Sequence, residues 1–130
     1  MAPELAARIP GAPELIDWFG HFPSFHDGSV LEFSLDLSRS GKLAVKGHRM
    51  NPEVDENGFY VLDKHCVVTF LFEDVTDAEL SFEDAPEIVF GIKVSEHGDG
   101  FEIELDAING FDAKFCMNKL GITFEPRDNI

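Results

Sequence analysis

The sequence predicts a mainly β (α+β) fold of about eight antiparallel strands with one short N-terminal helix packed on them. Two observations lead to this fold. Apolar and polar residues alternate with a period of two over most of the chain, and the runs are joined by turns of hairpin length. The strands can form either a β-sandwich or one curved antiparallel sheet, and the sequence leaves both open. A length of 130 residues predicts a single domain, residues 1–130.

The first regular element expected is a helix over residues 13–19. Pro13 suits the first helical turn, Glu14 suits the positive end of the helix dipole, and Gly20 ends the helix. Its apolar side consists of Leu15, Ile16, Trp18 and Phe19. The preceding residues 1–12 are proline-containing and show no period, so they are predicted to be a loose N-terminal arm.

Strand-like alternation starts at Ser29. Residues 29–37 and 43–50 are predicted strands joined by a turn at 38–42, and residues 51–58 are rich in turn formers and predicted to be a loop. A run over residues 65–73 is apolar on both faces in its centre, which indicates a middle strand covered on both sides.

The second half of the chain continues the pattern with short turns. Gly91 marks an expected β-bulge, and hairpin turns are expected at 97–100 and at 109–110. The predicted strands are residues 77–82, 86–96, 101–107, 111–117 and 121–126.

Charge narrows the range of partners. The chain has 25 Asp and Glu against 10 Lys and Arg, a formal net charge of −15. Such a surface repels nucleic-acid phosphates and acidic lipids, and it attracts basic partners in a salt-dependent way. Neither nucleic acid nor a membrane is therefore an expected partner. Solubility alone explains the charge about equally well.

The cysteines and the N-terminal residues indicate a reduced, cytoplasmic protein. Cys66 and Cys116 lie in apolar runs without CxxC or metal-ligand spacing, so they are expected to be small buried hydrophobes. Residues 1–20 contain acids and prolines and lack the apolar core of a signal peptide, and no run reaches transmembrane length. A chain exported without a cleavable signal would have the same features.

The most distinctive stretch is FGHFPSFHDGSVLEFSL, residues 19–35, because it carries an adjacent His26 and Asp27. A catalytic pair would need a further member, and no nucleophile, P-loop, GxGxxG or HExxH motif supplies one. The structural interpretation is favoured: Asp27 braces a turn by accepting backbone N–H bonds, and His26 donates to a carbonyl with its ring near Phe22 and Phe25. Trp18, Phe19, Phe22 and Phe25 then fill the space between helix and sheet.

No metal or cofactor is expected. No two of the five histidines have ligand spacing, and residues 74–84 lack the order of a calcium loop. The histidines are His21, His26, His48, His65 and His97.

Two acidic series are candidate partner-binding surfaces. From His65 to Ile92 the chain has no Lys or Arg. A second series, Glu102, Glu104 and Asp106, lies on one face of a predicted strand. Both series either bind a basic partner or form a solvated rim. The acids of the first series are Glu73, Asp74, Asp77, Glu79, Glu83, Asp84 and Glu87.

Residues 18–37, WFGHFPSFHDGSVLEFSLDL, resemble the signature of the immunity protein 50 family. The likeness rests on an aromatic-Gly pair, then Phe-Pro-Ser-Phe-His-Asp, then an alternating strand. The later layout is also similar, with a strand pair over residues 67–84 and a late Phe-Cys-Met at 115–117. The residues of the resembling motif are Trp18, Phe19, Gly20, Pro23, Ser24, Phe25, His26 and Asp27.

The resemblance implies a small β-rich protein of a bacterial polymorphic toxin system, which binds and neutralises a cognate toxin domain made by its own cell. It implies binding and not catalysis. Many toxins of such systems are nucleases with basic substrate channels, which an acidic inhibitor can occupy. The alternatives are a small metal-dependent hydrolase or a ligand-binding β-domain that uses the His26–Asp27 corner. Whether the protein is a monomer or a dimer is left open.

Overall fold

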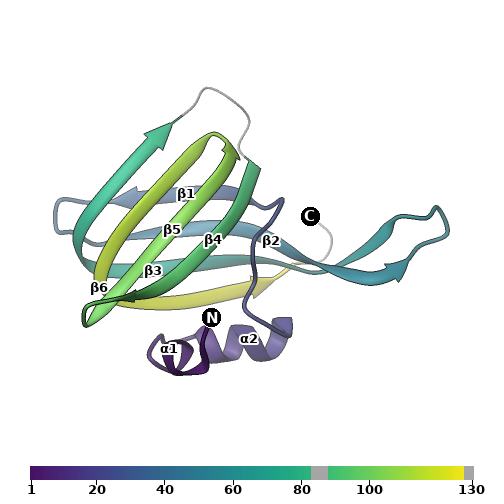
Figure 1. Ribbon diagram of the computed structural model, residues 1–130, viewed down its shortest axis with the longest axis horizontal. Helices are drawn as coiled ribbons and strands as arrows, with labels where there is room; N and C mark the ends of the chain where they lie inside the picture. The colour runs from purple at the N-terminus through teal and green to yellow at the C-terminus, as the bar shows by residue number, and fades with distance from the viewer. Residues whose placement is uncertain (83–87, 128–130) are drawn as a thin grey trace.

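Six antiparallel strands form one open, strongly curved sheet with two short helices beside it (Figure 1). The structure is a computed structural model and describes residues 1–82 and 88–127. The strand order is β1-β2-β3-β6-β5-β4. The predicted mainly β, antiparallel fold is confirmed, and the curved sheet is the alternative that forms. The elements are α1 (Pro3–Ala7), α2 (Ala12–Phe19), β1 (Ser29–Leu35), β2 (Gly41–Val54), β3 (Tyr60–Phe82), β4 (Ile88–His97), β5 (Gly100–Asn109) and β6 (Phe111–Pro126).

The described residues form six strands, and not about eight, because two predicted breaks do not occur. The predicted strands 65–73 and 77–82 are both part of β3, which bends at Asp74 (φ 56°) and shifts register between Val75 and Asp77 without ending. The predicted strands 111–117 and 121–126 are likewise one strand, β6. A bulge lets a long strand curve while most of its ladder of hydrogen bonds continues.

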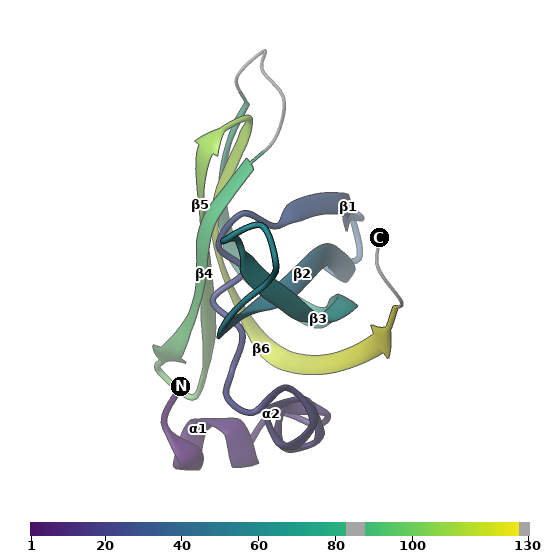
Figure 2. The same cartoon turned by 90° about the vertical axis from the view of Figure 1, so that its right-hand side faces the viewer.

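The two long strands β3 and β6 divide the sheet into two halves. The first part of β3 pairs with β2, and the first part of β6 pairs with β5, while β3 and β6 pair with each other from Cys66 opposite Pro126 to Phe82 opposite Phe111. Figure 2 shows the resulting β1–β2 half and β4–β5 half set at a large angle, with the segment between α2 and β1 running between them.

The concave side of the sheet holds a core of phenylalanine rings. The Phe33 ring centroid lies 5.1 Å from that of Phe111, 5.7 Å from Phe115 and 6.2 Å from Phe72. Phe25, which precedes β1, is 1% exposed and its ring lies 5.9 Å from that of Phe70. Edge-to-face contacts of this kind add to the free energy gained from burying the rings. Phe25 thus packs on β3, whereas the expected aromatic contact between helix and sheet is made by Trp18 of α2, whose ring centroid lies 5.4 Å from that of Phe124 in β6.

The prediction of a loose arm over residues 1–12 is wrong. Residues Pro3–Ala7 form α1, and Leu5, Ala6 and Ile9 are buried. The Pro10 carbonyl accepts a hydrogen bond of 2.7 Å from the Ile122 N–H, on the part of β6 that β5 no longer covers. Pro3 lies in the first turn of a helix, where a missing N–H costs nothing.

The predicted helix over 13–19 is confirmed as α2, Ala12–Phe19. Gly11 precedes it at φ 90°, and a Cβ there would lie 1.7 Å from the Ile122 carbonyl oxygen. Gly20 ends the helix at φ 105°, and its N–H donates to the Ile16 carbonyl. Glycine at position 11 therefore lets the start of the helix lie directly against β6.

Half of the predicted loop over residues 51–58 is strand, because residues 51–54 belong to β2 and only residues 55–58 form the turn. β2 continues to Val54 and β3 begins at Tyr60. The Asp55 carboxylate accepts the N–H groups of Asn57 and Phe59, and Gly58 adopts φ 83°. We call residues 49–63, which project from the sheet at the right of Figure 1, the β-arm.

No described helix is long and apolar enough to cross a lipid bilayer.

Candidate functional site

Residues 24–28 form a tight corner that joins the two edges of the sheet. Ser24 O accepts a hydrogen bond of 3.2 Å from the Ile92 N–H. The Asp27 N–H donates to Val89 O, and the Val89 N–H donates to Gly28 O, both at 3.0 Å. The corner directly precedes β1 at one edge, and Val89 and Ile92 belong to β4 at the other. These backbone bonds satisfy groups of an otherwise open edge strand.

The His26 side chain also binds β4. Its Nδ1 lies 3.1 Å from the Phe90 carbonyl oxygen, which confirms the expected hydrogen bond to a carbonyl. Its ring packs edge-on against Phe90 at 5.6 Å, and not near Phe22 and Phe25 as expected. The difference arises because β4, distant in sequence, covers this side of the corner.

Asp27 contributes to the corner through its backbone conformation. Phe25 and Asp27 both have positive φ, 63° and 61°, so the chain reverses here and brings His26 Nε2 to 3.6 Å from Asp27 Oδ2. The side chains are 52% and 55% exposed. The expected backbone N–H donors to the Asp27 carboxylate are not found among the residues that the structure describes. The pair is thus an exposed contact on a backbone corner.

Near this corner the structure brings together His48 and His65, whose ring centroids are 5.7 Å apart. Burial lowers the pKa of His48, and so does the charge of His65, while Asp27 raises it. The two residues lie on neighbouring strands, β2 and β3, and their 17-residue separation hides the contact in the sequence. His48 therefore stays neutral down to a lower pH than an ordinary histidine does.

A continuous acidic surface lies on the convex side of the β4–β5 half. Along β5, Phe101, Ile103 and Leu105 are buried, so the alternating Glu102 and Glu104 point away from the core. We call this surface the acidic outer face. Its carboxylates are Asp77, Glu79, Glu102, Glu104, Asp106 and Asp112.

Strand order brings the second acidic series and part of the first onto this face. Glu104 of β5 lies opposite Lys114 of β6, and Lys114 lies opposite Glu79 of β3. Lys93 of β4 lies opposite Glu104 on its other side. Six carboxylates against these two lysines leave a formal charge of −4 on one face of four strands. A shallow hollow lies over it, lined by Glu79, Ser81, Glu104, Asp106, Asp112 and Lys114 among others.

The first predicted series is only partly on this face. Asp77 and Glu79 are exposed there, whereas Glu73 lies at the bend of β3 with Lys119 at 3.9 Å. The Asp74 carboxylate accepts a hydrogen bond of 2.6 Å from Asn118 Nδ2, so it braces the bend. The remaining three, Glu83, Asp84 and Glu87, lie outside the described residues.

One end of the acidic outer face groups three different metal-ligand types. Donor atoms of His97, Glu102 and Cys116 all lie within 4.8 Å of one another. The residues are separated along the chain, which is why no ligand spacing is visible in the sequence. Glu102 Oε1 lies 3.6 Å from Lys114 Nζ, whose charge opposes a cation at this position. We therefore assign no metal to this group.

Both cysteines are free and buried, as predicted. Burial raises the pKa of the Cys66 thiol to about 11. Burial also raises the pKa of Cys116, with smaller contributions from the charges of Glu102 and Asp77. Both side chains are therefore thiols, and not reactive thiolates, at neutral pH.

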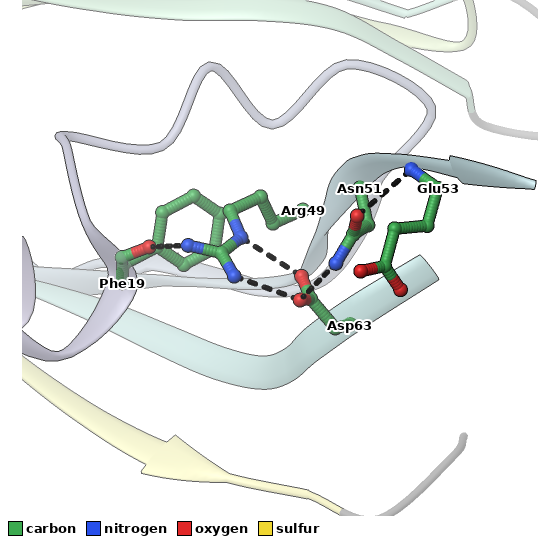
Figure 3. Close-up of polar contacts among 5 residues, drawn as sticks. All are labelled: Phe19, Arg49, Asn51, Glu53 and Asp63. Atoms are coloured by element: carbon green, nitrogen blue, oxygen red, sulfur yellow. Dashed lines mark hydrogen bonds and ion pairs between the residues drawn. The ribbon is translucent and has the colours of Figure 1, made fainter. Parts of the chain in front are cut away.

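A polar cluster at the base of the β-arm was not predicted (Figure 3). Arg49 donates from Nε and Nη2 to the two carboxylate oxygens of Asp63 at 2.8 and 2.7 Å, and from Nη1 to Phe19 O at 3.0 Å. Asn51 Nδ2 donates to the same carboxylate at 3.2 Å. The cluster ties the β-arm to the end of α2. The predicted loop over residues 51–58 gave no reason to place Arg49 beside Asp63, because a loop has no strand register.

Comparisons with known proteins give no match to a family model, to a curated protein or to a solved structure.

Proposed function

We propose that this protein binds and neutralises a toxin domain of a bacterial polymorphic toxin system in the cytoplasm, and that the acidic outer face contacts the toxin. The observation that carries the proposal is the convergence of Asp77, Glu79, Glu104 and Asp106 on one face. The motif at residues 18–37, which resembles the immunity protein 50 family, supports the same class of function.

The chemistry of the face favours a basic protein partner. Carboxylates at alternate positions of a strand repeat about every 6.7 Å and form a regular row of negative charge. A toxin that acts on nucleic acid presents lysines and arginines at its substrate channel, and such a row can occupy that channel in place of phosphates. The attraction accelerates the encounter and weakens as salt is added.

The corner residues have a different part in this proposal. His26 and Asp27 bind β4 and join the sheet edges, so their contacts serve the fold. We assign them no catalytic role and assign no cofactor to the protein.

Co-expression tests this proposal. The C-terminal domain encoded by the reading frame immediately upstream is induced in a bacterial host, with or without this protein, and growth is followed. We expect the domain to stop growth, this protein to restore growth, and the two to co-elute as one complex. An unrelated domain of similar size and net charge is the control and should not restore growth. Toxicity without rescue, or rescue by the control, would contradict the proposal.

A further inference from the structure

The β-arm is a two-stranded ribbon that stands clear of the rest of the sheet. The pairing of β1 with β2 reaches no further than Ser29 opposite Lys46. The pairing of β6 with β3 begins at Cys66 opposite Pro126. Within residues 1–82 and 88–127, no third strand therefore lies beside residues 49–63, and Figure 1 shows the ribbon projecting beyond β1 and β6.

One face of the β-arm is apolar and open to solvent. Met50 lies opposite Leu62, and Val54 lies opposite Tyr60. Residues directly opposite each other in an antiparallel pair share a face, and Tyr60 and Leu62 are two positions apart on the same strand. The exposed fractions are 55% for Met50, 43% for Leu62, 57% for Val54 and 60% for Tyr60. An isolated exposed apolar residue is ordinary, but four on one face of a free ribbon form a patch.

The other face of the β-arm is polar and fixes the ribbon. It carries the bidentate Arg49–Asp63 pair, which also reaches Phe19 O at the end of α2. At the tip the Asp55 carboxylate holds the turn by accepting two backbone N–H bonds. Exposed apolar residues on a ribbon held at its base and at its tip are preorganised, which lowers the entropy cost of binding.

Charge indicates what covers the apolar face. From Met50 to Leu62 the chain carries Glu53, Asp55 and Glu56 and no Lys or Arg. A second copy of this chain, with its own net charge of −15, would bring like charges together around the same residues. A cleft with apolar walls and a rim of lysines and arginines complements both the apolar face and the acids.

We propose that the apolar face of the β-arm inserts into a basic-rimmed apolar cleft of the toxin domain. This inference rests on the proposed function and adds a second contact to it. The acidic outer face attracts the toxin from a distance, while the β-arm provides the desolvated anchor that slows dissociation. Aromatic side chains such as Tyr60 are typical of such anchors.

The test compares two double variants that remove equal numbers of exposed apolar side chains. Val54→Thr with Tyr60→Thr changes the β-arm, and Leu31→Thr with Leu71→Thr changes exposed positions on β1 and β3. Threonine retains strand propensity, so both variants should fold, which thermal unfolding checks. Each is titrated calorimetrically against the catalytically inactivated toxin domain from the upstream reading frame.

We expect the β-arm variant to raise the Kd about 30-fold or more, and the β1–β3 variant to change it less than about threefold. Equal affinity of the β-arm variant and the wild type would overturn the β-arm inference and leave the proposed function standing. Absence of binding by the wild type would overturn both. A wild-type dimer in sedimentation that dissociates in the β-arm variant would assign the apolar face to a second copy and also refute the inference.

Discussion

The Arg49 guanidinium and the Asp63 carboxylate form a two-pronged ion pair, with N···O distances of 2.8 and 2.7 Å. The third Arg49 nitrogen donates to the Phe19 carbonyl, at the last residue of α2. Helix C-terminal carbonyls have no partner within the helix and attract cations. One side chain thus connects β2, β3 and α2, and it sets the direction in which the β-arm leaves the sheet.

Removal of the Asp63 charge should destabilise the fold. We expect Asp63→Asn to lower the Tm by a few degrees, because Arg49 and Asn51 lose a charged acceptor. The matched control is Glu125→Gln, which breaks the more exposed Arg127–Glu125 pair and should have little effect. Equal Tm changes in the two variants would show that the Arg49–Asp63 pair is no more than a surface contact.

The Arg49–Asp63 pair predicts that the free energy of unfolding depends on pH. The hydrogen bond from Arg49 is the main cause that lowers the pKa of Asp63, and Asn51 adds to it. A carboxyl whose folded pKa is lowered contributes stability above its unfolded pKa, about 4, and loses it as pH falls through the folded value. The difference in free energy of unfolding between wild type and Asp63→Asn should therefore shrink below about pH 4. A difference that stays constant down to pH 2.5 in urea unfolding would contradict this assignment.

Asp27 should affect the stability of the fold through its backbone conformation. At φ 61° an alanine is strained, whereas glycine is not. We expect Asp27→Ala to lower the free energy of unfolding by about 1 kcal/mol and Asp27→Gly to lower it less. Chemical denaturation measures both. Unchanged stability in both variants, together with lost growth rescue, would instead give Asp27 a direct role in binding or catalysis.

The buried Cys66 thiol predicts a loss of stability in alkali. Its folded pKa of about 11 lies above the reference value of 9.0, so its contribution is complete below pH 9 and is lost as pH rises towards 11. We expect Cys66→Val to be less sensitive than the wild type to a change from pH 9 to 11 in urea unfolding. Parallel curves for the two proteins would show that Cys66 ionises equally in the folded and unfolded states.

The sequence predicts local features of the fold better than it predicts strand continuity. Alternation identified β1, β4 and β5, and Gly20 marked the end of α2, because these signals lie within a few residues. The bend at Asp74 looks like a strand break, since acids and threonine interrupt the apolar run. Pairing with β6 on one side keeps β3 continuous, and that long-range contact has no local signal.

The candidate site shows the same limit. The alternation of Glu102, Glu104 and Asp106 was predicted, and their outward direction is confirmed. Their position beside Glu79 depends on β6 lying between β3 and β5, which hairpin-length turns alone do not specify. The sequence did not predict the β-arm, because residues 51–58 are rich in turn formers. In the structure only residues 55–58 make the turn.

The proposed function requires that the acidic outer face recognise the toxin domain. A triple variant, Asp77→Lys, Glu79→Lys and Asp106→Lys, reverses three of its exposed acids. A control triple variant, Glu14→Lys, Asp17→Lys and Glu125→Lys, makes the same change in net charge outside that face. Comparing the two separates the effect of the face from the effect of total charge.

The most direct measurement is the association rate of each triple variant with the inactivated toxin domain, by stopped flow at low and at physiological salt. We expect the acidic-outer-face variant to associate at least about tenfold more slowly than wild type at low salt and to depend less on salt, while the control stays within about threefold of wild type. Equal slowing by both variants, or no slowing by either, would contradict recognition through the acidic outer face.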